Sequence, residues 1–171
     1  MKEKEGIIRQ NKKFLIEQQS QDPGLTMETM IEAEIALGVI RCNGNNNSSE
    51  LDKAKKGSWE WTYNSSGRNL VKMWWLTKFF CRLVENLVTK ADMSLVDGCQ
   101  DAYTEGFGSN HSWIVRKGAM LAMMTVGSRE AMLAKWELQS AEELRPVLES
   151  VTTIRDKLTH ILESRSLTDL P

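Results

Sequence analysis

The stretch from Arg68 to about Lys90 places the strongest constraint on how this chain folds. Side chains that are nearly all apolar recur there at the spacing of one helical face, and further apolar residues cover much of the remaining circumference. A helix that is apolar around most of its surface has to be packed on two sides, so it belongs in the middle of a layered helical domain. The first set is Leu70, Met73, Trp74, Thr77, Phe80, Cys81, Val84 and Leu87, and the second is Val71, Trp75, Leu76, Phe79 and Leu83.

Helical patterns account for most of the remaining chain as well. We expect N-caps at Thr26 and Ser128, a capping box from Ser140 to Glu143, and tightened early turns at Pro146. The pattern shows neither a strand nor an internal repeat, so the sequence predicts an all-α chain whose residues 1–171 form one domain. The expected helices cover 3–19, 27–38, 94–107, 113–126, 128–136 and 140–163, and 42–67 is expected to be a long surface loop. The apolar face of the 27–38 helix is expected to be Met27, Met30, Ile31, Ile35 and Leu37.

Charge and cysteine content exclude several classes of protein. With 22 basic and 23 acidic residues the chain has no overall attraction for nucleic acid, so any basic site must be local. Cys42, Cys81 and Cys99 are odd in number and widely spaced, which indicates reduced thiols rather than disulfides or a metal site. We see no secretory signal and no apolar run of about 18 residues, and therefore expect the protein in the cytosol.

Enzyme signatures are scarce. The chain has two histidines, His111 and His160, and neither lies in a metal-binding or nucleophile motif. No glycine-rich phosphate loop follows a strand, and nothing nominates a Ser/His/Asp triad. The sequence therefore predicts a protein that is not an enzyme, with no catalytic residues, no metal and no cofactor.

The sharper feature is a pair of cations inside the apolar helix. Arg68 and Lys72 are four residues apart and share one helical face, with Trp75 one turn further along. One interpretation is that Lys72 simply extends to water. The other is that the two cations and an aromatic wall form a pocket for an anionic, partly apolar ligand such as a phosphate monoester.

Two residues near the next apolar helix also have two interpretations each. His111 is either a capping or surface histidine or a donor to a ligand oxygen beside a helix N-terminus. Trp113 is either a core residue or an exposed anchor in the membrane interface, which its amphipathic ring suits. The methionines of 118–124 are either core filler or the lining of a cavity for acyl chains of variable length.

Several motifs taken in order resemble the glycolipid transfer protein superfamily. The C-terminal residues 166–171 look like those of its ceramide-1-phosphate transfer protein branch, and the resemblance covers nearly the whole chain. It implies a two-layer helical sandwich that shields one sphingolipid and carries it between membranes without chemistry. The motifs are Arg68-Asn69-Leu70-Val71-Lys72, Asp101-Ala102-Tyr103, His111-Ser112-Trp113-Ile114-Val115-Arg116 and Ser128-Arg129-Glu130.

The resemblance also implies a headgroup site. Arg68 and Lys72 match the cation pair of the phosphate-selective branch, His111 matches its histidine, and Lys4 is the best match for its lysine. Because the sugar-binding branch has a tryptophan where this chain has Lys72, a phosphosphingolipid such as ceramide-1-phosphate is favoured over a glycolipid. Trp75 is a candidate wall of the lipid cavity.

Other implications concern partners. Trp113 matches a position near the membrane-facing surface of the family, so we expect transient membrane contact by a monomer that binds no nucleic acid. Two other functions stay open: a lipid sensor or protein-interaction module that keeps the fold without transferring lipid, and a carrier of sugar-bearing lipids.

One departure from the family pattern affects the N-terminus. The family's aspartate, which binds the sphingoid amide and hydroxyl, would fall immediately before Met1, and the helix that precedes it has no counterpart here. We therefore expect a shortened domain that lacks about one helix of the sandwich. The chain is then either a fragment or alternative-start product, or a divergent member of the family with weakened binding.

Overall fold

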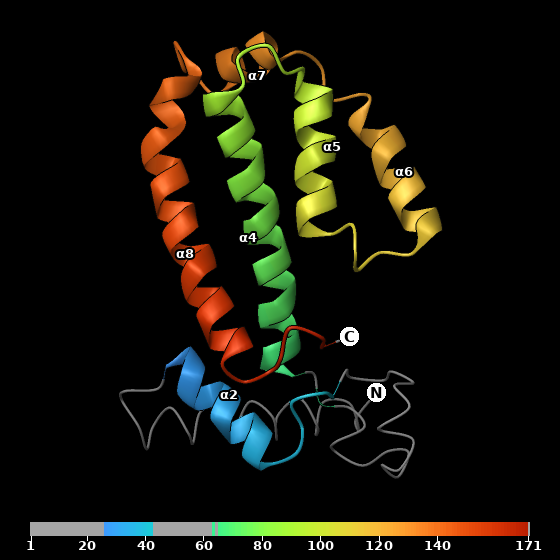
Figure 1. Ribbon diagram of the computed structural model, residues 1–171, viewed down its shortest axis with the longest axis vertical. Helices are drawn as coiled ribbons and strands as arrows, with labels where there is room; N and C mark the ends of the chain where they lie inside the picture. The colour runs from blue at the N-terminus through green and yellow to red at the C-terminus, as the bar shows by residue number, and fades with distance from the viewer. Residues whose placement is uncertain (1–25, 43–62, 64, 171) are drawn as a thin grey trace, which may run out of the picture. The chain divides into compact units, whose positions relative to one another are not determined.

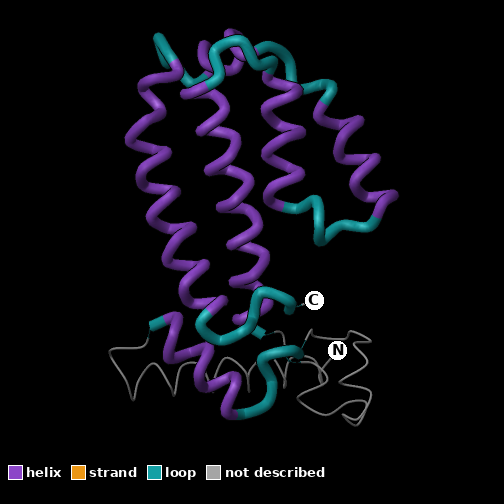
Figure 2. The backbone as a smooth tube through the Cα atoms, viewed as in Figure 1, coloured by secondary structure: helices purple, strands orange, loops and turns teal. Residues whose placement is uncertain are grey.

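The computed structural model describes residues 26–42, 63 and 65–170, and every regular element in these ranges is a helix (Figure 2). The predicted all-α class is confirmed, while the predicted helix over 3–19 and most of the loop over 42–67 lie outside the described residues. Two compact units can be distinguished. The first contains the described residues up to Val71 together with 165–170, and the second runs from Lys72 to Ser164. The expectation of a single domain over 1–171 stays a prediction.

The first unit is built on the short helix α2, Met27–Ala36. Thr26 caps it as predicted, since its hydroxyl accepts a hydrogen bond from the backbone N–H of Thr29. The chain leaves the helix through Gly38, whose positive φ of 70° favours glycine. The apolar face predicted for this helix is partly wrong, because Ile31 is buried whereas three of the other members are exposed: Met27, Ile35 and Leu37.

A buried carboxylate on α2 holds the start of the long helix α4, Ser66–Thr89. Glu34 is 2% exposed and accepts hydrogen bonds from the backbone N–H groups of Ser66 at 2.7 Å and Gly67 at 3.0 Å. The hydroxyls of Tyr63 and Ser65 donate to the same carboxylate at 2.7 and 2.9 Å. The first N–H groups of a helix have no partner within it and carry partial positive charge, so an anion placed there both satisfies and stabilises them.

The second unit contains the rest of α4 and the helices packed beside it, which Figure 1 shows in the order α8, α4, α5 and α6. Trp74 on α4 donates its indole N–H to the Thr159 hydroxyl on α8 at 2.8 Å. On another side, α4 lies against α5, so the predicted packing of this helix on two sides is confirmed. Met73 and Phe80 of α4 are nevertheless about half exposed. The bounds are α5 Leu95–Gly106, α6 Trp113–Met123, α7 Arg129–Lys135, a 3-10 turn η1 Ala141–Leu144, and α8 Arg145–Glu163.

The end of α4 is held by a cation from α7. The Arg129 guanidinium donates to the backbone carbonyl of Lys90 at 3.0 Å and to that of Leu87. The last carbonyls of a helix lack partners and carry partial negative charge, which a guanidinium complements. Ser128 caps α7 as predicted. The predicted helix over 140–163 is divided, because the capping box of Ser140 starts η1 and α8 follows with a proline near its start.

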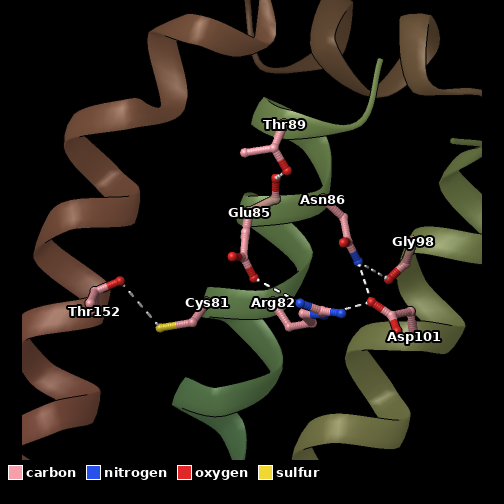
Figure 3. Close-up of polar contacts among 8 residues, drawn as sticks. All are labelled: Cys81, Arg82, Glu85, Asn86, Thr89, Gly98, Asp101 and Thr152. Atoms are coloured by element: carbon pink, nitrogen blue, oxygen red, sulfur yellow. Dashed lines mark hydrogen bonds and ion pairs between the residues drawn. The ribbon is translucent and has the colours of Figure 1, made fainter. Parts of the chain in front are cut away.

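A polar network joins α4 to α5 (Figure 3). Asp101 accepts hydrogen bonds on one carboxylate oxygen from Arg82 Nε at 2.6 Å and from the Asn86 amide at 2.8 Å. The same amide donates to the carbonyl of Gly98 at 3.3 Å. The hydrogen bonds from Asn86 and Arg82 hold the pKa of Asp101 below its usual range.

Gly106 marks the closest approach of α5 to α4. A Cβ atom there would lie 2.7 Å from the carbonyl oxygen of Trp75 and 2.9 Å from the backbone nitrogen of Phe79. Both of these atoms belong to the α4 backbone, so they are unable to rotate away as a flexible side chain could. The two helices therefore approach each other this closely only because residue 106 has no side chain.

Gly106→Ala should destabilise the protein, because the new methyl group forces the two helices apart. Overpacking of this kind costs about 1–3 kcal/mol, which outweighs the roughly 0.5–1 kcal/mol that alanine gains over glycine inside a helix. Gly118→Ala on α6 is the matched control, since nothing lies within 4 Å of its Cβ position, and it should stabilise the protein slightly. Urea unfolding of the three proteins measures both changes, and equal stability of Gly106→Ala and wild type would contradict the close packing.

Asp101→Asn should lower the free energy of unfolding at neutral pH, by an amount that shrinks as the solution is acidified. The folded-state pKa of Asp101 is depressed, so its stabilising effect is present above the unfolded pKa and is lost as pH falls through the folded pKa. Below that point wild type and variant should converge. Unfolding curves measured from pH 7 to pH 2 test this, and the same substitution in an Arg82→Met background should show a smaller pH dependence.

Candidate functional site

Arg68 is a buried cation in the first turn of α4. Its side chain is 4% exposed, and its Nη1 donates to the backbone carbonyl of Arg41 at 3.4 Å. Its Nε is buried and has no hydrogen-bond partner, and no carboxylate forms an ion pair with it, among the residues that the structure describes. Burial lowers the pKa of the guanidinium. This is a charged group held out of water with its charge uncompensated by the described part of the chain.

Lys72 lies one turn further along α4 and is exposed. The interpretation in which this lysine extends to water is therefore confirmed, and no desolvation has to be offset. Within the described ranges Lys72 forms no ion pair, unlike Lys78 on the same helix, which lies 3.8 Å from a carboxylate oxygen of Glu105. Its ammonium group is therefore available to an anion from solution.

Trp75 is half-buried, and its indole N–H has a different environment from that of the adjacent Trp74. The Trp74 indole N–H is bonded to α8, whereas Trp75 Nε1 is buried with no hydrogen-bond partner among the described residues. An indole is a large apolar surface with one polar atom, so it suits the wall of an apolar cavity. The role of Trp75 as a cavity wall stays a prediction.

His111 is half-buried and has one ring nitrogen occupied. Its Nδ1 lies 2.6 Å from the hydroxyl oxygen of Tyr103 on α5, and its ring stacks on that of Phe107 with centroids 5.4 Å apart and planes 13° apart. Phe107 in turn contacts Phe79 on α4 at 5.9 Å, so an aromatic series connects the histidine to α4 (within the second unit). The cap of α6 is Ser112, so the interpretation of His111 as a capping residue is wrong.

Trp113 begins α6 and is exposed. It is 65% exposed and the following Ile114 is 76% exposed, so the interpretation of Trp113 as a core residue is wrong. Lys117, one turn further on, places its Nζ 5.9 Å from the centroid of the Trp113 ring. An exposed apolar pair beside a cation is a surface typical of contact with membranes or partners.

The residues predicted for the site do not all lie in the same compact unit of the chain. Lys4 lies outside the described residues, Arg68 belongs to the first unit, and Lys72, Trp75, His111 and Trp113 belong to the second. Sequence reasoning missed Glu34, because a carboxylate among apolar residues gives no signal of its distant partners. It also missed the role of Tyr103, because α5 ends at Gly106 and His111 lies beyond that end, where helical spacing no longer tells which residues meet. None of the described helices is long and apolar enough to cross a membrane.

Comparison with known proteins identifies the family. Residues 8–137 match the glycolipid transfer protein family, which is more than half of the chain. The chain belongs to the glycolipid transfer protein family. Over 80 residues it is 34% identical to the mouse ceramide-1-phosphate transfer protein, a stretch that covers 43% of this chain and 36% of that relative. Within the family it is therefore similar to the ceramide-1-phosphate transfer proteins.

Solved structures show that the fold is shared. The apo-form of the mouse ceramide-1-phosphate transfer protein matches with a TM-score of 0.67 at 19% identity, covering 85% of this chain and 65% of that one. The human ceramide-1-phosphate transfer protein in complex with 12:0 ceramide-1-phosphate matches with a TM-score of 0.70 at 17% identity, covering 98% and 77%. The structural match thus covers about two thirds of the mouse protein, whereas the sequence match covers 36% of it. The predicted fold of the family is confirmed.

Proposed function

We propose that this chain binds one phosphosphingolipid and carries it between membranes without chemical change, with ceramide-1-phosphate as the favoured ligand. Membership of the glycolipid transfer protein family supports a lipid carrier. The similarity to proteins named for ceramide-1-phosphate transfer, one of them seen with 12:0 ceramide-1-phosphate, supports the phosphate headgroup.

The observation that carries this proposal is the buried guanidinium of Arg68, which has no ion-pair partner among the described residues. Removing a charge from water costs several kcal/mol unless an opposite charge and hydrogen-bond acceptors compensate it. The described residues supply one carbonyl and no carboxylate. A phosphate group would supply both the missing charge and several acceptor oxygens in a geometry that the planar guanidinium fits. An anionic ligand would therefore compensate the charge that the described residues leave unpaired.

The family resemblance assigns Lys72 and His111 to the same headgroup site as Arg68. Lys72 is a solvent-exposed cation that can meet a phosphate at the protein surface. A stacked tryptophan, which would suit a sugar ring, is absent at that position. His111 has its Nε2 without a hydrogen bond among the described residues, which leaves it for a ligand oxygen. Lys4 and Trp75 are assigned to the headgroup site and the cavity wall from the family resemblance alone.

Arg68→Ala should lower the rate at which labelled ceramide-1-phosphate moves between vesicles by roughly tenfold or more. A charge-assisted hydrogen bond is worth about 1.5–3 kcal/mol, and about 1.4 kcal/mol corresponds to a factor of ten. Lys72→Ala should reduce transfer by a smaller factor, because an exposed cation acts through solvent. A fluorescence assay with donor and acceptor vesicles measures both rates, and circular dichroism confirms that each variant is folded.

Two controls make this experiment decisive. Lys157→Ala removes an exposed lysine from α8 and should leave transfer unchanged. Galactosylceramide in place of ceramide-1-phosphate should be transferred poorly by wild type. Unchanged ceramide-1-phosphate transfer in both site variants would refute the proposed site, and efficient galactosylceramide transfer would favour a carrier of sugar-bearing lipids instead.

We further propose that the start of α6 touches the membrane during loading and release. The surface is formed by Trp113 and Ile114, both largely exposed, with Arg116 and Lys117 beside them. Tryptophan prefers the boundary between headgroups and acyl chains, and neighbouring cations attract anionic lipids. The cytosolic location and the monomeric state stay predictions.

Trp113→Ala should weaken binding to vesicles, because it removes the largest apolar side chain from this surface. Sedimentation with phosphatidylserine-containing vesicles measures the bound fraction. Trp136→Ala is a matched control, since Trp136 is an exposed tryptophan at the C-cap of α7 and should not affect binding. Equal loss in both variants, or in neither, would show that α6 is not the membrane-contacting surface.

A further inference from the structure

The contact between Tyr103 and His111 links a buried helix residue to a proposed ligand-binding residue. Tyr103 lies on α5 and is 5% exposed, and its hydroxyl oxygen is 2.6 Å from His111 Nδ1. A histidine ring has two nitrogens, and in its neutral form one donates while the other accepts. Which nitrogen carries the hydrogen therefore decides what His111 can offer to a ligand.

The surroundings of the hydroxyl indicate the direction of this hydrogen bond. Burial raises the pKa of Tyr103, so its oxygen carries a hydrogen at neutral pH. Within the described part of the chain that hydrogen has no acceptor other than His111 Nδ1. If Nδ1 were the donor instead, the buried hydroxyl would be left without an acceptor, which is unfavourable. The tyrosine is therefore the donor, and Nδ1 is the acceptor.

We infer that Tyr103 is a positioning residue that holds His111 in the form protonated at Nε2 and directs this N–H toward an oxygen acceptor of the bound lipid. The inference rests on the proposed function, because it takes His111 to meet the ligand. Nε2 lies on the ring opposite the bonded side, and it has no partner among the described residues. His111 then offers a donor and no acceptor, so the site selects ligands that present a carbonyl or phosphoryl oxygen at this point.

The ring is also fixed in its plane. Phe107 stacks on it at 5.4 Å, and the backbone N–H of His111 donates to the Phe107 carbonyl at 3.1 Å. Gly108 makes the connecting turn possible, since a Cβ there would lie 2.6 Å from the carbonyl oxygen of Thr104. With one face stacked and one nitrogen bonded, the imidazole loses the freedom to flip. A donor held in one direction loses less entropy when a ligand binds than a freely rotating one.

The composition of the chain makes a direct test practical. There are two histidines and two tyrosines, so His160, which is exposed, is an internal reference for His111, and Tyr63 is a matched control for Tyr103. Tyr63 is buried as well, but its hydroxyl donates to Glu34. Long-range proton–nitrogen correlation spectra of the ligand-free protein at pH 7.5 report which nitrogen of each neutral histidine is protonated.

In wild type, His111 should be almost entirely in the Nε2–H form, to a greater degree than His160. Tyr103→Phe should bring the ratio of the Nε2–H to the Nδ1–H tautomer of His111 close to the ratio for His160. Tyr63→Phe should leave the His111 tautomer ratio unchanged. An Nδ1–H form in wild type, or the same His111 ratio in Tyr103→Phe as in wild type, would overturn the inference. The wild-type spectrum alone decides the tautomer if the Tyr103→Phe variant does not fold.

The second arm measures vesicle-to-vesicle transfer of labelled ceramide-1-phosphate. Tyr103→Phe should reduce it by about two- to tenfold, the factor that one neutral hydrogen bond supplies, and should add little to the loss caused by His111→Ala. Full transfer by Tyr103→Phe would overturn the positioning role. No transfer by wild type would refute the proposed function, while the ligand-free spectra would still report the tautomer independently.

Discussion

The helix α4 depends on charges that other elements place at its two ends. The Glu34 carboxylate receives the first N–H groups, and the Arg129 guanidinium donates to the last carbonyls. Each charge complements the partial charge of the end it meets, and each satisfies backbone groups that the helix itself leaves without partners. The candidate cation Arg68 and the aromatic residues that reach His111 are all carried by this helix or packed on it.

Much of the fold could be predicted from the sequence, because local rules decide where a helix begins and which residues share a face. The caps at Thr26 and Ser128 and the long helix from 66 to 89 follow from hydroxyl positions and spacing alone. Spacing does not reveal what lies against a face, however. That is why Ile35 was expected inside and is exposed, while Glu34 beside it is buried.

The same limit applies to the candidate site. Arg68 and Lys72 have equivalent positions in the helical pattern, yet one is buried and the other is in solvent, because only the first is covered by the rest of its unit. Burial of this kind arises from chain segments distant in sequence, such as Arg41, whose carbonyl receives the guanidinium. The bond between Tyr103 and His111 depends on the course of the turn between them, which no periodicity encodes. The family resemblance provides the candidate residues, and the structure shows what those within its described ranges contact.

The burial of Arg68 has a further consequence if the proposed site is occupied by an anion. The described residues give this buried cation no counter-charge, which weakens the native state. An anion that binds the folded chain but not the unfolded chain would restore stability in proportion to the logarithm of its free concentration. Molecules without ligand would then unfold more often than molecules with ligand bound. Because quality-control proteases act on opened molecules, the steady-state amount of such a protein would follow the supply of its cargo.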